Sequence, residues 1–166
     1  MTDFHWRPMR ESDLDGVAVV ASIAFPGHFE EQACFAERLA LFPGGCFVLA
    51  AHDRILGYLI AYPWAPAAIP PLNSLLGCLP ATAEAVYLHD LALHPDARGH
   101  GAARLMIERL AGSLRSLGTR RIALVAVNAS VPFWQKMGFA PVRDDPSLTA
   151  KLQSYGGDAT YMTRPL

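Results

Sequence analysis

The stretch 93–103 reads LHPDARGHGAA, and it decides the interpretation of the whole chain. It follows an apolar, β-prone run, Val86–Leu93, and it leads into Gly101–Leu117, where apolar residues recur at helical spacing. The sequence therefore predicts a strand, a glycine-containing turn and a helix that begins with small residues. The start of such a helix has unpaired N–H groups and a partial positive charge, which suits a diphosphate, although a plain helix-entry turn has the same pattern.

The segments around this stretch alternate between strand and helix patterns. Cys46–Ala51 and Ile55–Tyr62 flank a short polar turn and are predicted to form a hairpin. Arg121–Val127 is apolar almost throughout, as in a central strand that is covered on both faces. The other predicted elements are a strand at His5–Met9, a helix capped by Ser12 or Asp13 that ends before Pro26, and a helix at Glu30–Leu41. A right-handed crossover is expected between the strands that flank the helix Gly101–Leu117.

Length and composition favour one mixed α/β domain over residues 1–166. Fourteen Lys and Arg against fifteen Asp and Glu give a net charge of -1, which argues against a nucleic-acid or membrane partner. Hydrophobic residues reach 52%, which excludes disorder. The apolar stretch Gly16–Phe25 has about half of the roughly 20 residues of a membrane span, so a cytoplasmic protein is expected. The three cysteines contain no CxxC and the histidines no paired spacing, so no metal is expected.

Pro63–Ala83 differs from the rest of the chain because it contains five prolines. It cannot form a long regular element. A loop of this length forms either a lid or binding surface, or a surface excursion that packs its own leucines. The leucines of this segment could also pair two subunits, so a homodimer is possible. They are Leu72, Leu75, Leu76 and Leu79.

Three motifs resemble those of the GNAT N-acetyltransferases. The spacing RxxGxA at 98–103 is similar to the family signature Arg/Gln-x-x-Gly-x-Gly/Ala, Asp90–Pro95 resembles its fourth strand, and Val131–Phe139 resembles its later helix-turn that ends in Gly-Phe. The resemblance covers roughly 84–142. It implies a single-domain fold with a mixed, mostly antiparallel sheet flanked by helices, in which a central pair of parallel strands splays apart.

The resemblance also implies acetyl-CoA as co-substrate, with its pantetheine arm between the splayed strands like an added strand. Backbone groups of the fourth strand would contact the thioester and pantetheine, and plain core packing of those side chains is compatible with this. The implied cofactor-binding residues are Leu91, Ala92 and Leu93 on the strand, Arg98, Gly99, His100, Gly101, Ala102 and Ala103 around the pyrophosphate, and Asn128, Trp134 and Lys136 on the other side.

Catalysis requires a base, because an amine with a pKa near 10.4 is free in only about one molecule in 2,500 at pH 7. His89 is the leading candidate: it shares a strand face with Leu91 unless a bulge intervenes. The stretch 88–94 also resembles arylalkylamine N-acetyltransferases, in which a matching histidine serves as a base, although their second histidine is replaced here by Tyr87. Asp90 competes as a base or as a structural carboxylate, and the structural role is favoured because strand alternation places its side chain opposite His89.

The general acid is a departure from the family pattern. Trp134 stands where the family often has a tyrosine near the CoA sulfur, and indole cannot donate a useful proton. A thiol with a pKa near 8.5 also leaves acceptably as a thiolate. Ser130, Tyr155 or Tyr161 could substitute as the donor.

The leading hypothesis is therefore an enzyme that transfers the acetyl group of acetyl-CoA directly to an amine acceptor, a small molecule or, alternatively, a protein amine. A non-catalytic acyl-CoA-binding module would need the same residues 98–103 but no base. A dinucleotide-binding enzyme is disfavoured, because no GxGxxG follows an early strand.

Overall fold

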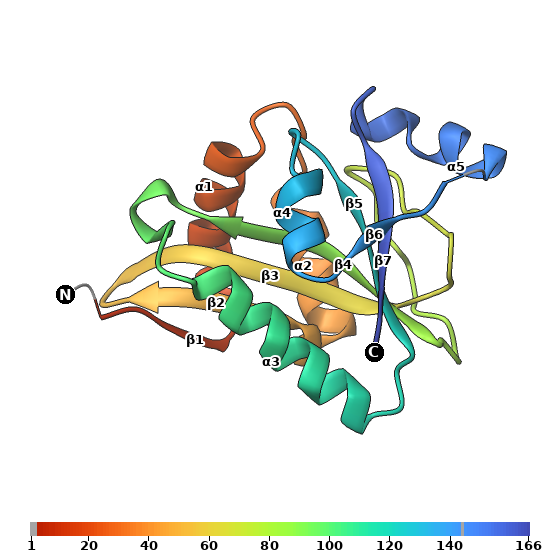
Figure 1. The fold of residues 1–166 in the computed structure, drawn as a ribbon. Coiled ribbons are helices and arrows are strands. Elements are labelled where there is room, and N and C mark those ends of the chain that lie inside the picture. The colour runs from red at the N-terminus through yellow and green to blue at the C-terminus, as the bar shows by residue number, and fades with distance from the viewer. Residues whose placement is uncertain (1–2, 144) are drawn as a thin grey trace.

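One seven-stranded sheet passes through the computed structural model, which describes residues 3–143 and 145–166 (Figure 1). The strand order is β1-β2-β3-β4-β5-β7-β6. Among the described strands only β4 and β5 run parallel to each other, which confirms the mixed, mostly antiparallel sheet. The strands are β1 (His5–Pro8), β2 (Cys46–Ala51), β3 (Arg54–Trp64), β4 (Ala85–Leu93), β5 (Arg121–Ala126), β6 (Ala140–Pro141) and β7 (Thr160–Pro165).

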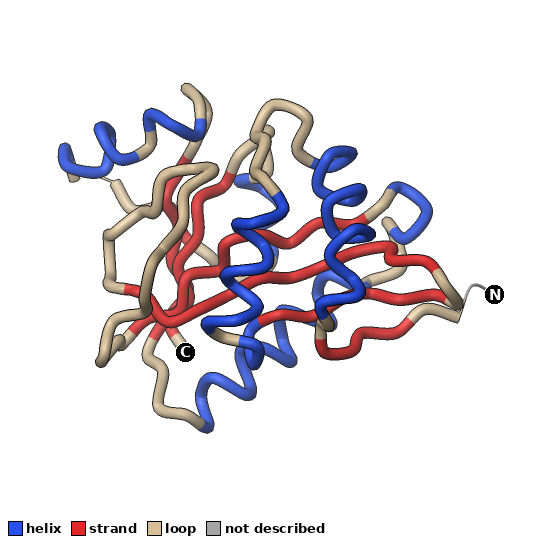
Figure 2. Tube along the Cα trace, turned by 180° about the vertical axis from the view of Figure 1, so that it is seen from behind, coloured by secondary structure: helices blue, strands red, loops and turns tan. Residues whose placement is uncertain are grey.

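Helices cover both faces of this sheet. Figure 2 shows α1 (Leu14–Ala24) and α2 (Gln32–Leu41) on one face, where they pack on side chains such as Tyr58. The other face is covered by α3 (Ala102–Ser116) and α4 (Val131–Lys136). The remaining helices are α5 (Pro146–Lys151) and the short 3-10 turns η1 (Glu11–Asp13), η2 (Pro43–Gly45), η3 (Pro95–Ala97) and η4 (Gln153–Tyr155). In the described part of the chain, no helix has the length and apolarity needed to cross a membrane.

The predicted elements are present with small differences at their ends. Helix α2 begins at Gln32, so Glu30 lies in the turn before it. Strand β3 continues through Pro63 to Trp64, past the predicted end at Tyr62. A proline is tolerated there because the pairing of β3 with β2 ends at Ile60, so its missing N–H removes no hydrogen bond on that side. The elements after residue 142 were not predicted.

The central parallel pair is splayed, as expected. Strands β4 and β5 pair at Ala85↔Arg121, Val86↔Ile122 and Tyr87↔Ala123, and their pairing ends there. On its other side β4 contains a bulge, because Ile60 pairs with Asp90 and Ala61 pairs with Leu88. His89 is therefore the extra residue of a β-bulge.

Residues 65–84 connect β3 and β4 without a helix or strand. Leu72, Leu76 and Leu79 pack against the apolar cluster beneath α1 and α2, so the segment packs part of its own leucines. Two carboxylates, one on α2 and one in the turn before it, hold this segment. Glu37 accepts from the backbone N–H groups of Leu76 at 2.6 Å and Gly77 at 3.0 Å. Glu30 accepts from the N–H of Asn73 at 3.2 Å. The segment is thereby fixed next to the sheet opening.

Candidate active site

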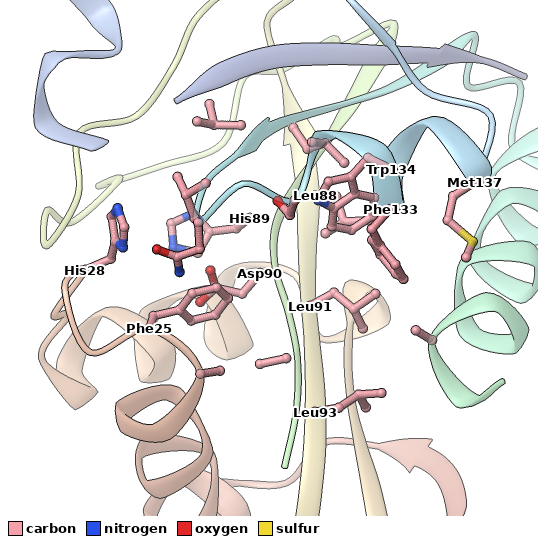
Figure 3. Close-up of a pocket in the computed structure, with 18 of the residues that line it drawn as sticks. Phe25, His28, Leu88, His89, Asp90, Leu91, Leu93, Phe133, Trp134 and Met137 are labelled. Carbon is pink, nitrogen blue, oxygen red and sulfur yellow. The ribbon is translucent and has the colours of Figure 1, made fainter. Parts of the chain in front are cut away.

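A cavity of about 780 Å³ lies where β4 and β5 separate, and residues from both faces of the sheet line it. Figure 3 shows Phe25, His28, His89 and Asp90 on one side of β4, and Leu91, Leu93, Trp134 and Met137 on the other. We call the part on the helix α1 face the α1-side compartment. It is lined by Ala24, Phe25, His28, Glu30, Leu72, His89, Asp90, Val125, Val127 and Tyr155.

The structure brings most of the predicted site residues to this cavity. His100 and Lys136 do not line it: the His100 ring packs edge-on against Phe4, and the Lys136 carbonyl accepts from Arg104 at 3.3 Å. Both catalytic candidates line the cavity. The predicted cofactor residues that line it are Leu91, Ala92, Leu93, Arg98, Gly99, Gly101, Ala102, Ala103, Asn128 and Trp134.

The turn before α3 forms what we call the glycine cradle, residues 98–104. Gly99 and Gly101 have φ angles of 79° and 74°, a conformation that glycine adopts without strain. The first helical hydrogen bond is donated by Leu105 to the Gly101 carbonyl, and no N–H group from Gly99 to Arg104 donates to a described acceptor. A Cβ at Gly101 would meet nothing within 4 Å. Free N–H groups, small residues and open space at a helix start fit a phosphate group.

The bulge in β4 changes the positions of the two catalytic candidates. Strand alternation predicts that Asp90 points away from His89, and this expectation is wrong. Because His89 is the extra residue, both side chains lie on the α1 face, whereas Leu91 points to the α3 face. His89 therefore does not share a face with Leu91 either.

Glu30 joins these two residues in a buried cluster. His89 Nε2 lies 2.7 Å from Glu30 Oε1, and the side chains are 1% and 3% exposed. The Tyr58 hydroxyl donates to Asp90 Oδ2 at 2.9 Å, and the Tyr62 hydroxyl lies 3.3 Å from His89 Nδ1. The cluster could hold a metal ion chemically, because one ligand atom from each of the three acidic or imidazole groups lies within 4.8 Å of the others. Hydrogen bonds within the described residues already engage His89 and both oxygens of Glu30, and they engage one oxygen of Asp90.

The charges in this cluster depend on one another. Burial alone lowers the pKa of His89, but the charges of Asp90 and Glu30 and the hydrogen bond to Glu30 outweigh burial and raise it. Burial raises the pKa of Asp90 to about 6, although the nearby His89 opposes the shift. Burial also acts to raise the pKa of Glu30, yet the hydrogen bond from His89 leaves it lowered. The two carboxylates therefore favour the protonated form of His89, and His89 in turn favours the ionised forms of Glu30 and Asp90.

Sequence reasoning missed Glu30 as a site residue. It lies 59 positions from His89 and was placed at the start of a helix, and no spacing in the sequence connects the two. The nearest signal is the break at Pro26-Gly27, which ends α1 and lets the chain turn over the end of β4.

The candidate proton donors differ in their surroundings. The Tyr155 hydroxyl donates to the Pro70 carbonyl at 2.6 Å, and the Tyr161 hydroxyl accepts from the N–H of Ala67. Ser130 lines the cavity, and no hydrogen bond of its hydroxyl is seen among the described residues. Trp134 is 7% exposed and packs edge-on against Phe133 and Phe139.

Comparisons with known proteins agree with this fold. A family model described as the acetyltransferase (GNAT) family matches residues 9–139, well over half of the chain. No curated protein matches. Among solved structures, the loading GNATL domain of CurA from Lyngbya majuscula has a TM-score of 0.79 at 13% identity, covering 98% of both chains.

Two further structures contain ligands. The PaiA N-acetyltransferase from Thermoplasma acidophilum, in complex with coenzyme A, has a TM-score of 0.68 at 12% identity and covers 99% of both chains. Naa20 from Chaetomium thermophilum, in complex with a bisubstrate analogue, has a TM-score of 0.71 at 18% identity and covers 98% of this chain and 86% of that chain. At these identities the three structures show a shared fold.

Proposed function

The chain belongs to the acetyltransferase (GNAT) family, and from this premise we propose that it transfers the acetyl group of acetyl-CoA directly to the amine of a small molecule. One observation carries the proposal: a single cavity connects the glycine cradle on one face of the sheet to a buried carboxylate on the other. A cofactor held on the α3 face can then meet an acceptor that enters from the α1 face.

The cofactor end of the cavity suits coenzyme A. The free N–H groups from Gly99 to Arg104 would bind the pyrophosphate, with Arg98 beside them. Beyond Tyr87, β4 has no pairing partner on its β5 side, so the pantetheine amides can hydrogen-bond to the strand there. Bound CoA would supply the acetyl thioester. The complex of PaiA with coenzyme A supports this assignment. Among the predicted cofactor-binding residues, His100 and Lys136 have the least support because they do not line the cavity.

In this proposal Asp90 is the base, and the positive charge of His89 favours the ionised form of the Asp90 carboxylate. The neighbouring carboxylates raise the pKa of His89 and so favour its protonated form, which cannot accept a proton, whereas a carboxylate with a pKa of about 6 can accept one at neutral pH. Asp90 takes a proton from the ammonium of the acceptor, and the amine nitrogen then attacks the thioester carbonyl. The tetrahedral intermediate collapses with cleavage of the C–S bond. The surplus proton on the nitrogen passes to the leaving thiolate, directly or through the Ser130 hydroxyl, which takes up one proton as it gives up another, so CoA is released as a thiol. Asp90 then returns its proton to solvent.

A test separates this proposal from a non-catalytic acyl-CoA-binding module. Purified protein is incubated with acetyl-CoA and a panel of amines, thiol release is followed, and mass spectrometry identifies the N-acetyl product. Calorimetry measures acetyl-CoA binding in parallel. We expect binding together with amine-dependent thiol release. Binding without turnover on any amine would favour the binding module. The cytoplasmic location and the homodimer stay predictions.

A further inference from the structure

The α1-side compartment presents one carboxylate oxygen that accepts no hydrogen bond from the described residues. Glu30 accepts from His89 with one oxygen and from the N–H of Asn73 with the other. Asp90 accepts from Tyr58 through Oδ2, and no described residue donates to Oδ1. One carboxylate oxygen is therefore left for a ligand.

The basic side chains near this compartment offer little to a carboxylate. His89 Nε2 lies 2.7 Å from Glu30, and His28 Nε2 donates to the Tyr155 carbonyl at 2.7 Å. His28 Nδ1 is buried and has no hydrogen-bond partner among the described residues, but with Nε2 as the donor a neutral imidazole has only a lone pair at Nδ1, which cannot donate to a carboxylate. The two guanidinium groups that line the cavity, Arg98 and Arg104, belong to the glycine cradle on the opposite face. Within the described residues, no lysine or arginine lines the α1-side compartment.

The other walls of the compartment are apolar. Tyr155 contributes its ring, because its hydroxyl already donates to the Pro70 carbonyl. The apolar lining residues are Ala24, Phe25, Leu72, Val125 and Val127. A ligand that fills this space must place carbon atoms against these side chains, and a polar group facing them would lose its hydration without gaining a hydrogen bond.

We infer that the acceptor is a compact primary monoamine with an apolar body and no carboxylate. One ammonium group matches the one free oxygen of Asp90. An amino acid would bury a carboxylate without a cation, and a diamine would bury a second ammonium without an anion. The inference rests on the proposed amine transfer and narrows its substrate class.

The wall of the compartment also limits the length of the acceptor. Tyr155 is 5% exposed and connects two other segments, through its hydroxyl to Pro70 and through its carbonyl to His28. Ser154 accepts from the N–H of Leu72 at 3.4 Å, and Lys151 donates to the Ala67 carbonyl at 2.8 Å. These bonds join three segments around the end of the compartment, so we expect an extended peptide to fit there less well than a short amine.

Matched acceptors test the inference. Thiol release is measured with isopentylamine against leucine, pentylamine against 1,5-diaminopentane, and both monoamines against an extended peptide with an N-terminal leucine. Isopentylamine and leucine differ only in the carboxylate. We expect kcat/KM for each monoamine to exceed that of its matched competitor at least about 100-fold, as for a site that cannot pair the added group.

A variant gives the test a second arm. Leu72→Arg places a cation in the wall, and Leu72→Gln controls for the lost apolar side chain; melts and acetyl-CoA calorimetry verify that both variants fold. We expect Leu72→Arg, but not Leu72→Gln, to raise the leucine-to-isopentylamine ratio of kcat/KM at least about tenfold. Leucine, the diamine or the peptide matching the monoamines in the wild type would overturn the inference and leave the proposed function standing. No turnover on any amine despite acetyl-CoA binding would overturn both.

Discussion

Glu30 and His89 form a buried ion pair in which His89 Nε2 lies 2.7 Å from Glu30 Oε1. The pair links the turn between α1 and α2 to the bulge of β4. The second carboxylate oxygen of Glu30 accepts from the N–H of Asn73, so Glu30 also holds the segment 65–84. The Glu30 side chain thus connects three chain segments around the catalytic candidates. Its removal should lower the stability of the fold and, as a distinct effect, change the activity.

Glu30→Gln should destabilise the fold most at mildly acidic pH, between the ordinary pKa values of Glu30, 4.5, and His89, 6.5. The raised pKa of His89 means that its charged form stabilises the fold below its ordinary pKa, and this contribution is lost as the pH rises through the raised value. The lowered pKa of Glu30 means that its own contribution is lost as the pH falls. Breaking a buried pair costs about 3 to 5 kcal/mol.

Thermal melts of Glu30→Gln from pH 5 to 9 check this prediction. The difference from the wild type should be largest at the acidic end and should shrink as the pH rises through the raised pKa of His89. Glu31→Gln is the matched control, because Glu31 is exposed and its side chain makes no capping hydrogen bond. A penalty that stays constant over this range would show that His89 is neutral throughout.

Asp90→Asn should lower kcat/KM by at least about 100-fold, because a positioned base contributes roughly 10² to 10⁴ to the chemical step. With Asp90 as base, the wild-type enzyme should lose activity as the pH falls through about 6, where this carboxylate becomes protonated. The variant should lose this acidic limb. Steady-state kinetics from pH 5 to 9 measure both effects, and acetyl-CoA affinity within a few-fold of wild type is the control.

His89→Gln separates the two base assignments. Loss of the imidazolium removes a positive charge that lowers the pKa of Asp90, so the acidic limb should move to higher pH while the plateau rate is largely kept. Activity lost equally at every pH in a folded variant would identify His89 itself as the base. The pH profile of kcat/KM decides between these outcomes.

Most of the sheet and the cofactor end of the cavity were predictable from the sequence because they depend on local patterns. The glycines at 99 and 101, the helical spacing of α3 and the apolar run of β5 each act within a few residues. These patterns, with the family motifs, were enough to place the splayed pair and the glycine cradle.

The geometry of the catalytic cluster was not predictable in the same way. Whether His89 and Asp90 share a face depends on one extra residue relative to β3, and nothing in the sequence of β4 specifies the bulge. The partner Glu30 arrives from a turn 59 residues away, by tertiary packing alone. Strand β6 was missed because it has only two residues, and β7 and α5 were missed because the sequence after residue 142 has no sustained period.

Trp134→Phe should be tolerated, since the structure gives this side chain only apolar neighbours in Phe133 and Phe139. Trp134→Ala should cost about 3 to 5 kcal/mol, because the site is buried. Chemical denaturation measures the free energy of unfolding, and kcat is measured on the folded Phe variant. A loss of kcat above about 100-fold in that variant would give the indole a role beyond packing.

Ala103→Glu tests the glycine cradle with the least disturbance to the fold. Gly101 is the more obvious position, but its φ of 74° adds a backbone cost of about 1 to 2 kcal/mol to any side chain there, so stability and binding would change together. Ala103 lies in the first turn of α3 and lines the cavity. A carboxylate there should occupy phosphate space and repel its charge, while it stabilises the helix start by about 0.3 to 1 kcal/mol.

Calorimetry should therefore show at least about a tenfold loss of acetyl-CoA affinity in Ala103→Glu, because one like-charge contact is worth about 1.4 kcal/mol. The melting temperature of the variant should equal or exceed that of the wild type. Leu105→Glu is the control, because Leu105 is 65% exposed on the same helix and does not line the cavity. Its affinity should stay within a few-fold of wild type. Equal affinity in the two folded variants would mean that the start of α3 does not bind the pyrophosphate, and the proposed transfer from acetyl-CoA would lose its cofactor site.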